Sequence, residues 1–155
     1  MTKLEFEQNI SALQSSLYRV ARSYLRCEHD CLDAISEAIL KAWQKLPSLR
    51  NEARFKAWLM RILIRECINI QRQQKRVSPM ETVPVCEQPQ DASFELMHAL
   101  DALPQRLRTP TVLYYMEGYR VADIAHILHS KKGTISSQLY QARALLRDAL
   151  KEEDL

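Results

Sequence analysis

Apolar residues recur every three or four positions over most of the first 76 residues, which is the period of amphipathic helices. Three such stripes can be followed, at 6–24, 32–46 and 53–76, and the last ends in a basic run. Leu32 is the first apolar member of the second stripe. Pro47 interrupts the pattern between the second stripe and the third. The first part of the chain is therefore predicted to contain three helices.

A segment without this periodicity follows at residues 77–92. Pro79, Pro84 and Pro89 recur every five residues among Glu, Gln, Ser and Thr. Because such a composition cannot bury an apolar face, we expect a flexible linker. Fully extended, it could span roughly 50 Å, so the parts on either side of it need not touch.

Beyond the linker the helical period returns in shorter segments. Pro104 suits the first turn of a helix, and Gly118 stands where one helix must stop and the chain must turn. Pro110 falls inside a predicted helix, so it indicates either a later helix start or a kink. The predicted helices of this part lie at about 93–103, 105–117, 120–128 and 132–151.

The composition favours an all-helical fold. Only 2 of the 155 residues are Gly, whereas hairpins, bulges and phosphate-binding loops consume glycine for positive φ angles. No apolar run reaches the roughly 18 residues that a membrane helix needs, and the first ten residues lack an apolar signal core. We expect an all-α protein of two small helical domains, located in the cytoplasm and without membrane insertion.

The chain has four cysteines, which we expect to be reduced thiols in that compartment. Cys27, His29 and Cys31 offer three metal-ligand side chains within five residues. A tetrahedral site needs a fourth ligand, however, and no Cys or His follows closely. No metal site and no other cofactor are therefore predicted.

Catalytic chemistry finds little support in the sequence. Asp123, His126 and His129 share a spacing of three residues, but histidine near a helix C-terminus is favoured by the helix dipole alone. No Ser/His/Asp set, no paired-carboxylate site and no nucleotide-binding loop is present. The protein is therefore not expected to be an enzyme.

The formal net charge of +3 hides an uneven distribution of charged residues. Lys and Arg exceed Asp and Glu in residues 1–78 and again in 96–150, whereas 79–95 carries four acids and no base. Two basic blocks on either side of an acidic strip indicate two surfaces that face a polyanion. Ordinary solvated helix faces around a polar linker are the alternative at this point.

The strongest local signal lies between residues 118 and 143. A short helix with Ile124, Ala125 and Leu128 facing inward, a turn, and a second helix with Ile135 and Leu139 facing inward reproduce a helix-turn-helix. The outward residues of its second helix would enter a DNA major groove, where Gln can read adenine and Lys can bind guanine or phosphate. A plain helical hairpin in an all-α core is the alternative. The outward residues are Lys132, Thr134, Ser136, Ser137, Gln138, Tyr140 and Gln141.

The third helix of the first part has the residue types that opening a DNA duplex requires. Aromatic side chains must replace lost base stacking, and cationic side chains must hold the displaced strand. Phe55 and Trp58 lie at the start of this helix, and Lys and Arg recur along it. At helical spacing both aromatic residues are more easily read as core, and the short loop at 49–52 is then the better candidate for a base-binding pocket.

These residues resemble the sigma-70 family. The series Leu103-Pro104, Arg108, Gly118, Asp123-Ile124-Ala125, Leu128, Gly133-Thr134-Ile135, Ala142-Arg143 and Leu146 is similar to the family's helix-turn-helix region 4. The acidic segment 30–43 is similar to the core-binding helix of region 2, and 55–62 to its promoter-melting segment. Two domains joined by only a short linker resemble the extracytoplasmic-function subgroup. The domains would be region 2 at 1–76, the linker at 77–92 and region 4 at 93–155.

The resemblance implies a sigma factor that directs RNA polymerase core to promoters without doing chemistry. Its partners would be the β′ and β subunits of the core enzyme, promoter DNA and an anti-sigma factor. The core-binding residues would be Asp30, Asp33 and Glu37. The residues that recognise and melt the −10 element would be Leu49, Arg50, Asn51, Lys56, Trp58, Arg61 and Arg65. The residues that read the −35 element would be the seven outward residues of the second helix named above.

The chain departs from the family pattern at several positions. In the acidic helix a frequent second acid is replaced by Leu32. At the helix-turn-helix turn the usual Gly is His129, which tolerates a positive φ better than most residues. On the second helix, positions that are usually Lys or Arg are Ser136, Gln138 and Gln141, so binding there should depend less on phosphate charge.

Two other functions remain open at this stage. An autonomous helix-turn-helix regulator would bind duplex DNA as a dimer, without polymerase. A degenerate sigma-like protein would bind polymerase or another partner without recognising a promoter. The degenerate alternative remains because the second helix of the helix-turn-helix lacks several basic residues that the family usually has there.

Overall fold

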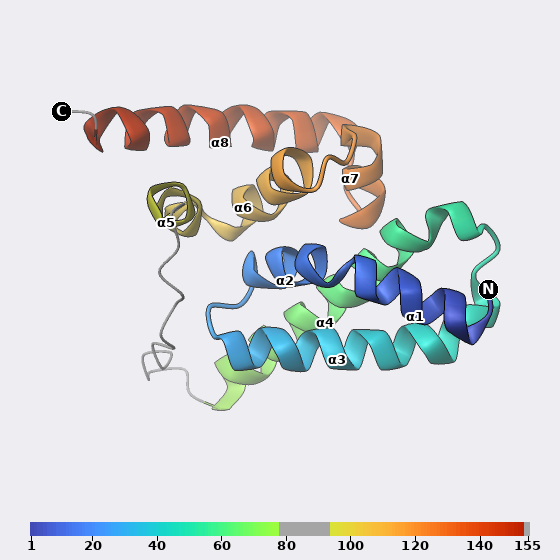
Figure 1. Cartoon of the computed structure of the whole chain (residues 1–155). Helices are drawn as coiled ribbons and strands as arrows, with labels where there is room; N and C mark the ends of the chain where they lie inside the picture. Colours follow the sequence, from blue (N-terminus) through green and yellow to red (C-terminus); the bar gives the residue numbers. More distant parts are fainter. Residues whose placement is uncertain (78–93, 154–155) are drawn as a thin grey trace. The chain divides into compact units, whose positions relative to one another are not determined.

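All described residues lie in helices or in the short connections between helices. The structure, a computed structural model, describes residues 1–77 and 94–153, and it has no strand in these stretches. The chain divides into two compact units, Met1–Glu87 and Gln88–Leu155 (Figure 1). The predicted all-α fold of two helical units is confirmed. The predicted linker lies outside the described residues, apart from Val77, which ends a helix.

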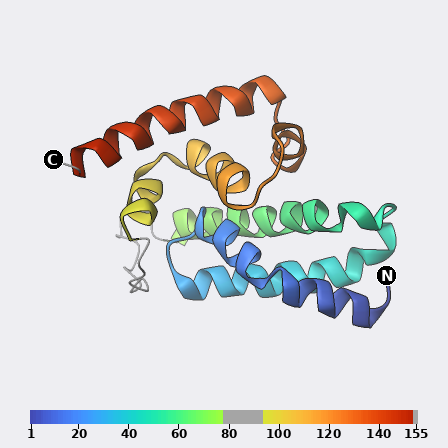
Figure 2. The same cartoon turned by 45° about the horizontal axis from the view of Figure 1, so that its top comes forward.

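Four α-helices build the described part of the first unit, where the sequence predicted three. Figures 1 and 2 both show its two long helices side by side, with the N-terminal pair packed across them. Two short 3-10 turns, η1 (Leu46–Ser48) and η2 (Glu52–Arg54), connect the long helices. The α-helices are α1 (Lys3–Ala12), α2 (Gln14–Arg22), α3 (Glu28–Lys45) and α4 (Phe55–Val77).

The first predicted stripe is divided at Leu13 into α1 and α2. Leu13 leaves helical geometry, with φ −101° and ψ 5°, but its N–H still donates to the carbonyls of Asn9 and Ile10, both at 3.1 Å. A shared bond of this kind marks a local tightening of the last helical turn. Because the apolar spacing of three or four residues continues across the break, the sequence pattern could not reveal it.

Small side chains on α3 allow α4 to pack closely against it. Ala34, Ala38 and Ala42 recur one turn apart and have no exposed surface. On α4 the completely buried side chains are larger, with Leu59 and Leu63 among them. The pairing of small with large side chains fills the space between these two helices.

One member of the predicted stripe on α3 was placed on the wrong face. Leu32 is 50% exposed, because the buried face passes through Cys31 and Ile35 instead. Leu40 and Trp43 are also exposed. The outer face of α3 is therefore partly apolar, and the sequence pattern had placed part of this surface in the core.

Four aromatic rings join α1, α3 and α4. The ring centroids of Phe6 and Trp43 are 5.1 Å apart, those of Phe6 and Phe55 5.7 Å, and those of Phe55 and Trp58 5.9 Å. Such pairs stabilise a fold by about 0.5–1.5 kcal/mol beyond their buried area. Phe55 is buried, as the core interpretation predicted, whereas Trp58 is half-buried.

Four α-helices and one π-helical turn build the described part of the second unit. Helices α6 and α8 pack together, and α5 and α7 also pack on α8. The core between α5, α6 and α8 includes Leu100, Leu103, Leu107 and Ala142. The elements are α5 (Phe94–Ala102), α6 (Gln105–Thr111), the π turn η3 (Val112–Met116), α7 (Val121–Ile127) and α8 (Lys132–Glu153).

Pro110 lies inside α6 and does not start a new helix. The chain passes directly from α6 into η3. Proline has no N–H for the helical ladder, and a π turn is one way in which a helix absorbs such a disruption. The hydroxyl of Thr111 also donates to the carbonyl of Leu107 at 2.7 Å. The disturbance expected from Pro110 therefore takes the form of a wider turn.

The guanidinium of Arg108 closes the C-terminal end of α5. Arg108 is only 8% exposed, and it donates to the carbonyls of Leu100 at 3.3 Å, Asp101 at 3.4 Å and Leu103 at 2.8 Å. The end of a helix leaves carbonyls short of donors, and Arg108 supplies donors there beside the N–H of Leu103, which also binds the Leu100 carbonyl at 3.1 Å. A positive charge at this end also complements the helix dipole. Arg108 thus fixes α5 to the rest of the unit.

Two residues with positive φ set the turns on either side of α7. Gly118 has φ 74°, and His129 has φ 52°. Both turns agree with the sequence predictions, since glycine is free to adopt such angles and His tolerates them better than most residues. After His129 the N–H of Ser130 donates to the carbonyl of Ala125 at 2.8 Å and closes the end of α7.

Two of the four cysteines are buried free thiols, Cys31 and Cys67. Burial raises the pKa of Cys31 to about 11 and also raises that of Cys67. Both are therefore unreactive packing residues. Cys27 is disulfide-bonded, so the prediction of four reduced thiols is wrong for this residue, because geometry as well as compartment decides pairing. No helix in the described stretches is long and apolar enough to cross a bilayer.

Candidate functional site

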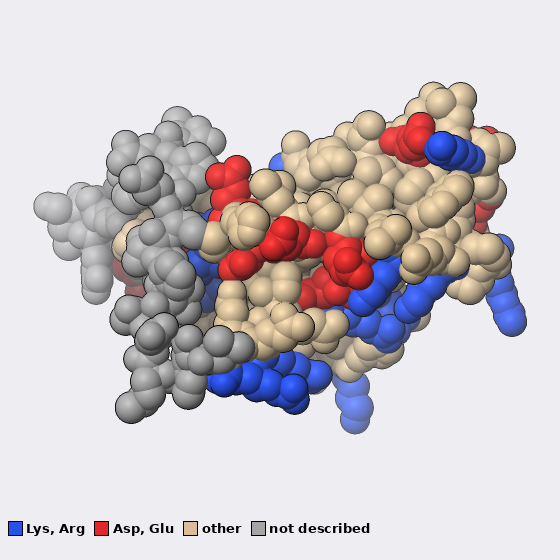
Figure 3. All heavy atoms as spheres, turned by 90° about the horizontal axis from the view of Figure 1, so that it is seen from below, with Lys and Arg blue, Asp and Glu red and all other residues tan. Residues whose placement is uncertain are grey.

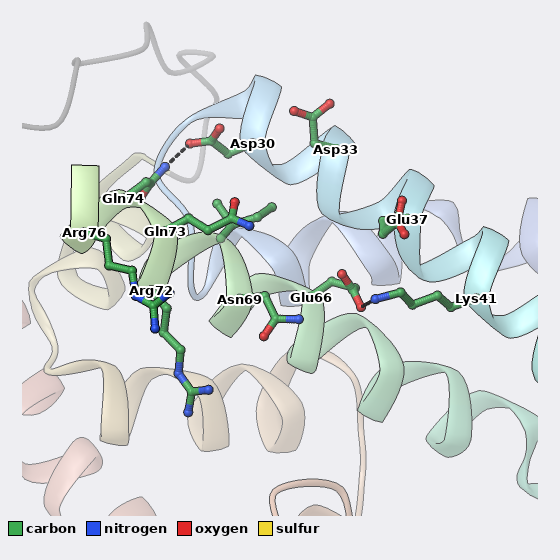
Figure 4. A pocket seen from close by; sticks show the side chains of 11 residues that line it. Asp30, Asp33, Glu37, Lys41, Glu66, Asn69, Arg72, Gln73, Gln74 and Arg76 are labelled. Atoms are coloured by element: carbon green, nitrogen blue, oxygen red, sulfur yellow. Dashed lines mark hydrogen bonds and ion pairs between the residues drawn. The ribbon is translucent and has the colours of Figure 1, made fainter. Parts of the chain in front are cut away.

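A groove of about 740 Å³ lies between α3 and α4 in the first unit (Figure 4). Helix α3 contributes mainly carboxylates to it, and α4 contributes mainly amides and guanidiniums. All three predicted core-binding residues line this groove. The lining residues are Asp30, Asp33, Glu37, Lys41, Glu66, Asn69, Ile70, Arg72, Gln73, Gln74 and Arg76.

Two contacts across the groove hold α3 and α4 together. The Gln74 amide nitrogen donates to Asp30 Oδ2 at 2.7 Å, and Lys41 Nζ donates to Glu66 Oε1 at 2.6 Å. Glu66 is only 8% exposed, so Lys41 provides the charge partner that a buried carboxylate requires. The same hydrogen bond raises the pKa of Lys41.

The other two acids of the groove remain open to a partner. Asp33 and Glu37 are exposed and one helical turn apart, and Figure 4 shows Asp33 turned away from the α4 side chains. Asp33 lies 3.4 Å from His29, an exposed contact that is ionic only when the histidine is protonated. Surface contacts of this kind contribute little to stability, so a docking partner could displace it at small cost.

Acidic side chains gather in one band on this face of the molecule, with Lys and Arg along its edges (Figure 3). On α3 the exposed apolar residues Leu32, Leu40 and Trp43 share the outer face with the exposed acids. An apolar patch beside charges of one sign is typical of a surface that docks another protein, since the apolar area supplies affinity and the charges supply orientation.

The loop between η1 and η2 carries three of the predicted −10 residues. Leu49 is half-buried, whereas Arg50 and Asn51 are exposed. The Asn51 side chain accepts from the N–H of Ala53 at 3.1 Å and so caps η2. The N-terminal ammonium of Met1 pairs with Glu52 of the same turn. These contacts shape the loop and leave Arg50 pointing to solvent.

The four predicted −10 residues of α4 follow this loop. Lys56, Trp58 and Arg61 are half-buried, and Arg65 is exposed. At 100° per residue, Trp58, Arg61 and Arg65 fall on one side of the helix. Phe55 is buried, so it cannot stack on a base without leaving the core. The structure therefore places Trp58, Arg61 and Arg65 on one side of α4 and Lys56 on the other.

Helix α8 presents most, but not all, of the predicted −35 residues. Six of the seven are exposed, and Tyr140 is 72% exposed. Gln138 is only half-buried, and its Oε1 is buried without a hydrogen-bond partner among the described residues. The prediction that Gln138 faces outward with the others is therefore only partly right, because its place on the helix borders the buried stripe of Ile135 and Ala142.

Contacts with neighbouring elements hold two polar side chains of α8. Arg106 of α6 donates through Nη1 to Gln141 Oε1 at 3.1 Å, and Gln141 donates through Nε2 to Ser137 Oγ at 3.4 Å. Farther along the helix, Arg143 donates to the hydroxyl of Tyr115 at 3.2 Å. The contacts made by Arg106 and Arg143 connect residues 35 and 28 positions apart, so no local sequence signal could have revealed them.

A metal centre has no counterpart in the described part of the chain. No group of three or more His, Cys, Asp or Glu residues in it could hold a metal ion. The arrangement instead offers two kinds of binding surface. One is the acidic and partly apolar outer face of α3, and the other is a helix-turn-helix whose second helix exposes mainly hydroxyls at the positions predicted to read DNA.

Both parts of the chain match sequence families. Residues 10–77 match Sigma-70 region 2, and residues 93–146 match Sigma-70, region 4. The chain is 33% identical over 147 residues to the RNA polymerase sigma factor SigV of Bacillus subtilis (strain 168), covering 92% of this chain and 89% of that one. It is also 33% identical over 146 residues to the ECF RNA polymerase sigma factor SigM of Mycobacterium tuberculosis (strain ATCC 35801 / TMC 107 / Erdman), covering 91% of this chain and 74% of that one.

A solved structure is similar as well. The sigma factor RpoE, crystallised with the anti-sigma factor NepR from Bartonella quintana, superposes with a TM-score of 0.84 at 26% identity. The match covers 95% of this chain and 97% of that chain.

Proposed function

The chain belongs to the sigma-70 family of RNA polymerase sigma factors, in its extracytoplasmic-function group, and from this premise we propose how its surfaces work at a promoter. As a sigma factor it directs RNA polymerase core to specific promoters for the initiation of transcription. The observation that carries this function is that regions 2 and 4 both match, in that order, on two helical units. An autonomous helix-turn-helix regulator is not favoured, because it would not explain why the first unit matches Sigma-70 region 2.

The outer face of α3 is proposed to dock on the β′ subunit of core polymerase. Asp33 and Glu37 would supply the charge that orients the encounter, and the exposed Leu40 would supply apolar area. Asp30 lines the same groove, with one carboxylate oxygen already bound to Gln74. We therefore assign Asp30 a weaker share of core binding than the other two acids.

The basic face of the first unit is proposed to recognise and melt the −10 element. A melted strand needs cations along its backbone and a pocket or ring for an unstacked base. The loop at 49–51 would receive the base, since Phe55 is committed to the core. Arg61 and Arg65 would bind the backbone, with Trp58 on the same side of α4. Lys56, on the other side of the helix, would contact DNA next to the loop.

Helix α8 is proposed to read the −35 element from the major groove. Among its exposed residues that were predicted to read DNA, all but Lys132 carry a hydroxyl or an amide, which make hydrogen bonds to base edges. Lys132 lies in the first turn of the helix, where phosphate is a common partner. Region 4 would begin at about residue 93, after a linker at 77–92, and region 2 would occupy 1–76.

The remaining parts of the proposal concern setting and regulation. The protein acts without enzymatic activity of its own, in the cytoplasm, together with the β′ and β subunits and promoter DNA. An anti-sigma factor is proposed as its regulator, because the sigma factor that it resembles in structure was crystallised with one. Such a partner would compete with core polymerase for the same exposed faces.

Run-off transcription tests the proposed function. Purified core polymerase is combined with the chain on DNA fragments taken upstream of its own gene. Core alone on the same fragments is the control, and elongation from a tailed template shows that the core is active. A discrete transcript that depends on the chain is expected. Tight binding to core with no specific transcript from any fragment would instead support the degenerate sigma-like alternative.

A further inference from the structure

Two arginines lie beside the part of α8 that is proposed to read DNA. Arg106 of α6 donates through Nη1 to Gln141 Oε1 at 3.1 Å. Arg143 of α8 donates through Nη1 to the hydroxyl of Tyr115 at 3.2 Å. Both arginines are exposed. Because their partners in these two contacts are neutral, the contacts hold the guanidiniums at the surface without compensating their charge.

Helix geometry places the two guanidiniums at opposite edges of α8. Gln141 and Arg143 are two positions apart, so their side chains leave the helix in directions about 160° apart. The exposed Ser137 and Tyr140 lie within this arc, and the buried stripe of the helix lies on the other side. Arg106 is bound to Gln141, so it marks one edge of the exposed face, and Arg143 marks the other.

This separation fits the major groove of DNA. The groove is about 12 Å wide, and the phosphates of the two strands border it. An α-helix with its side chains is about 10–12 Å across, so a helix in the groove brings its two edges to the two strands. The exposed positions predicted to read DNA carry a single charge, on Lys132 in the first turn. Any further ionic contact with phosphate therefore has to come from the edges of α8.

The chemistry of both edges suits a phosphate. A guanidinium is planar, always charged and able to bind a phosphate through two N–H groups at once. Each of the two arginines uses one N–H in its contact with Gln141 or Tyr115 and keeps others. The Tyr115 hydroxyl accepts from Arg143, so it keeps its own proton to donate to the same phosphate. A side chain that is already held also loses less conformational freedom when it binds.

We infer that Arg106 and Arg143 form a phosphate clamp, in which each arginine binds the backbone of one DNA strand on its own side of α8. The clamp holds the helix in the groove whatever the base sequence, since phosphates carry no sequence information. The inference rests on the proposed role of α8 in reading the −35 element. It gives the second unit one ionic contact with each strand, beside the uncharged groups that would distinguish bases.

DNA with neutral phosphates tests the clamp. The full chain is reconstituted with core polymerase and bound to promoters in which single phosphates of the upstream element are replaced by methylphosphonates, one position and one strand at a time. Competition against the unmodified promoter gives the affinity for each DNA. The variants are R106Q and R143Q, which remove the charge, R106K and R143K, which retain it, and Y115F, which removes only the hydroxyl. The matched control R26Q removes one charge from an exposed arginine of the first unit.

For the unaltered chain we expect sensitive phosphates on both strands, where neutralisation lowers the affinity about fivefold. R106Q should lose this sensitivity on one strand only, and R143Q on the other strand only. Each Gln variant should also reduce the slope of log affinity against log salt by about 0.9. R106K, R143K and R26Q should keep the sensitive phosphates of both strands. Y115F should weaken the contact on the Arg143 strand about twofold and leave the salt slope unchanged, because it removes no charge.

The possible failures are distinguishable. If no phosphate of the upstream element matters to the unaltered chain, α8 does not enter the groove there, and the proposed reading role fails together with the clamp. If sensitive phosphates exist on both strands but persist in R106Q and R143Q, the clamp alone is wrong. The clamp is also overturned if both Gln variants lose sensitivity on the same strand. A loss of the same phosphates in R26Q would overturn it as well, since net charge would then explain the effect.

Discussion

The two units of the chain present different side chains at the surfaces proposed to bind partners. In the first unit the charges line an open groove, where Lys41 pairs with Glu66 while Asp33 and Glu37 stay exposed. In the second unit the most firmly held charge, Arg108, is buried and closes the end of a helix. The exposed residues of α8 that are proposed to read DNA carry one charge, on Lys132, and are otherwise hydroxyls and an amide.

This difference indicates a division of labour between attraction and discrimination. Exposed charges act over distance, speed association and are weakened by salt. Neutral hydrogen-bonding groups act only at contact and distinguish one base edge from another. We therefore expect the first unit to provide most of the binding energy for core polymerase and melted DNA, and the second unit to select among promoters.

Charge reversal on α3 should produce the largest effect. The double variant D33K/E37K places two bases where a partner surface expects acids, so affinity for core polymerase should fall by about a hundredfold, or about 2.7 kcal/mol. Fluorescence anisotropy of the labelled chain with purified core measures this. The control E7K/D148K changes the net charge equally at exposed positions outside the groove. An equal loss in both double variants would show that only net charge matters.

The buried charge of the second unit should matter for stability instead. R108M removes a guanidinium that donates to two carbonyls of α5 and to the carbonyl of Leu103 just after it, so the free energy of unfolding of this unit should fall by about 2–3 kcal/mol. Amide hydrogen exchange of the full chain would show faster exchange in α5 and α6. Exchange in α3 and α4 should stay unchanged, and core affinity should be retained. Loss of core binding would contradict the assignment of docking to the first unit.

Salt titration of promoter complexes compares the two DNA-binding surfaces directly. R50A and R65A each remove a cation from the −10 surface, so each should reduce the slope of log affinity against log salt by about 0.7–0.9 per lost phosphate contact. Q141A should reduce affinity at promoters with an upstream element and leave the slope unchanged. A change of slope in Q141A would mean that the glutamine acts through the backbone charge.

Removing the hydrogen bond between Gln74 and Asp30 should have the smallest effect on the affinity for core polymerase. Q74A removes the hydrogen bond of 2.7 Å that occupies one oxygen of Asp30. Water replaces a neutral donor easily at the surface, so core affinity should change by less than about threefold. The same anisotropy measurement gives the value. A gain in affinity as large as the loss in D33K/E37K would make Asp30 a principal docking residue, contrary to the weaker share assigned to it.

The sequence predicted most of the fold because helix period and turn chemistry are local properties. The turns at Gly118 and His129 followed from the need for a positive φ, and both are present. The break at Leu13 could not be predicted, because the apolar stripe passes through it without a change of spacing. Leu32 was misplaced because small residues form the buried face of α3, and a pattern search gives weight to large apolar residues.

The sequence predicted which residues form the candidate site, but it did not predict which other side chains they contact. The acids of α3 and the polar side chains of α8 are visible as patterns along one helix. The partners that decide their availability come from other helices: Gln74 for Asp30, and Arg106 for Gln141. Such pairs depend on how the helices pack, so only the folded structure shows which groups remain free.

Site-specific crosslinking tests the division of labour most directly. A photoreactive amino acid replaces either Leu40 on α3 or Tyr140 on α8, both exposed and on opposite units. The labelled chain is assembled with core polymerase on a promoter and irradiated. We predict that position 40 crosslinks to the β′ subunit and position 140 to upstream promoter DNA. Crosslinks of position 140 to protein alone, or of position 40 to DNA, would contradict the roles proposed for α8 and α3.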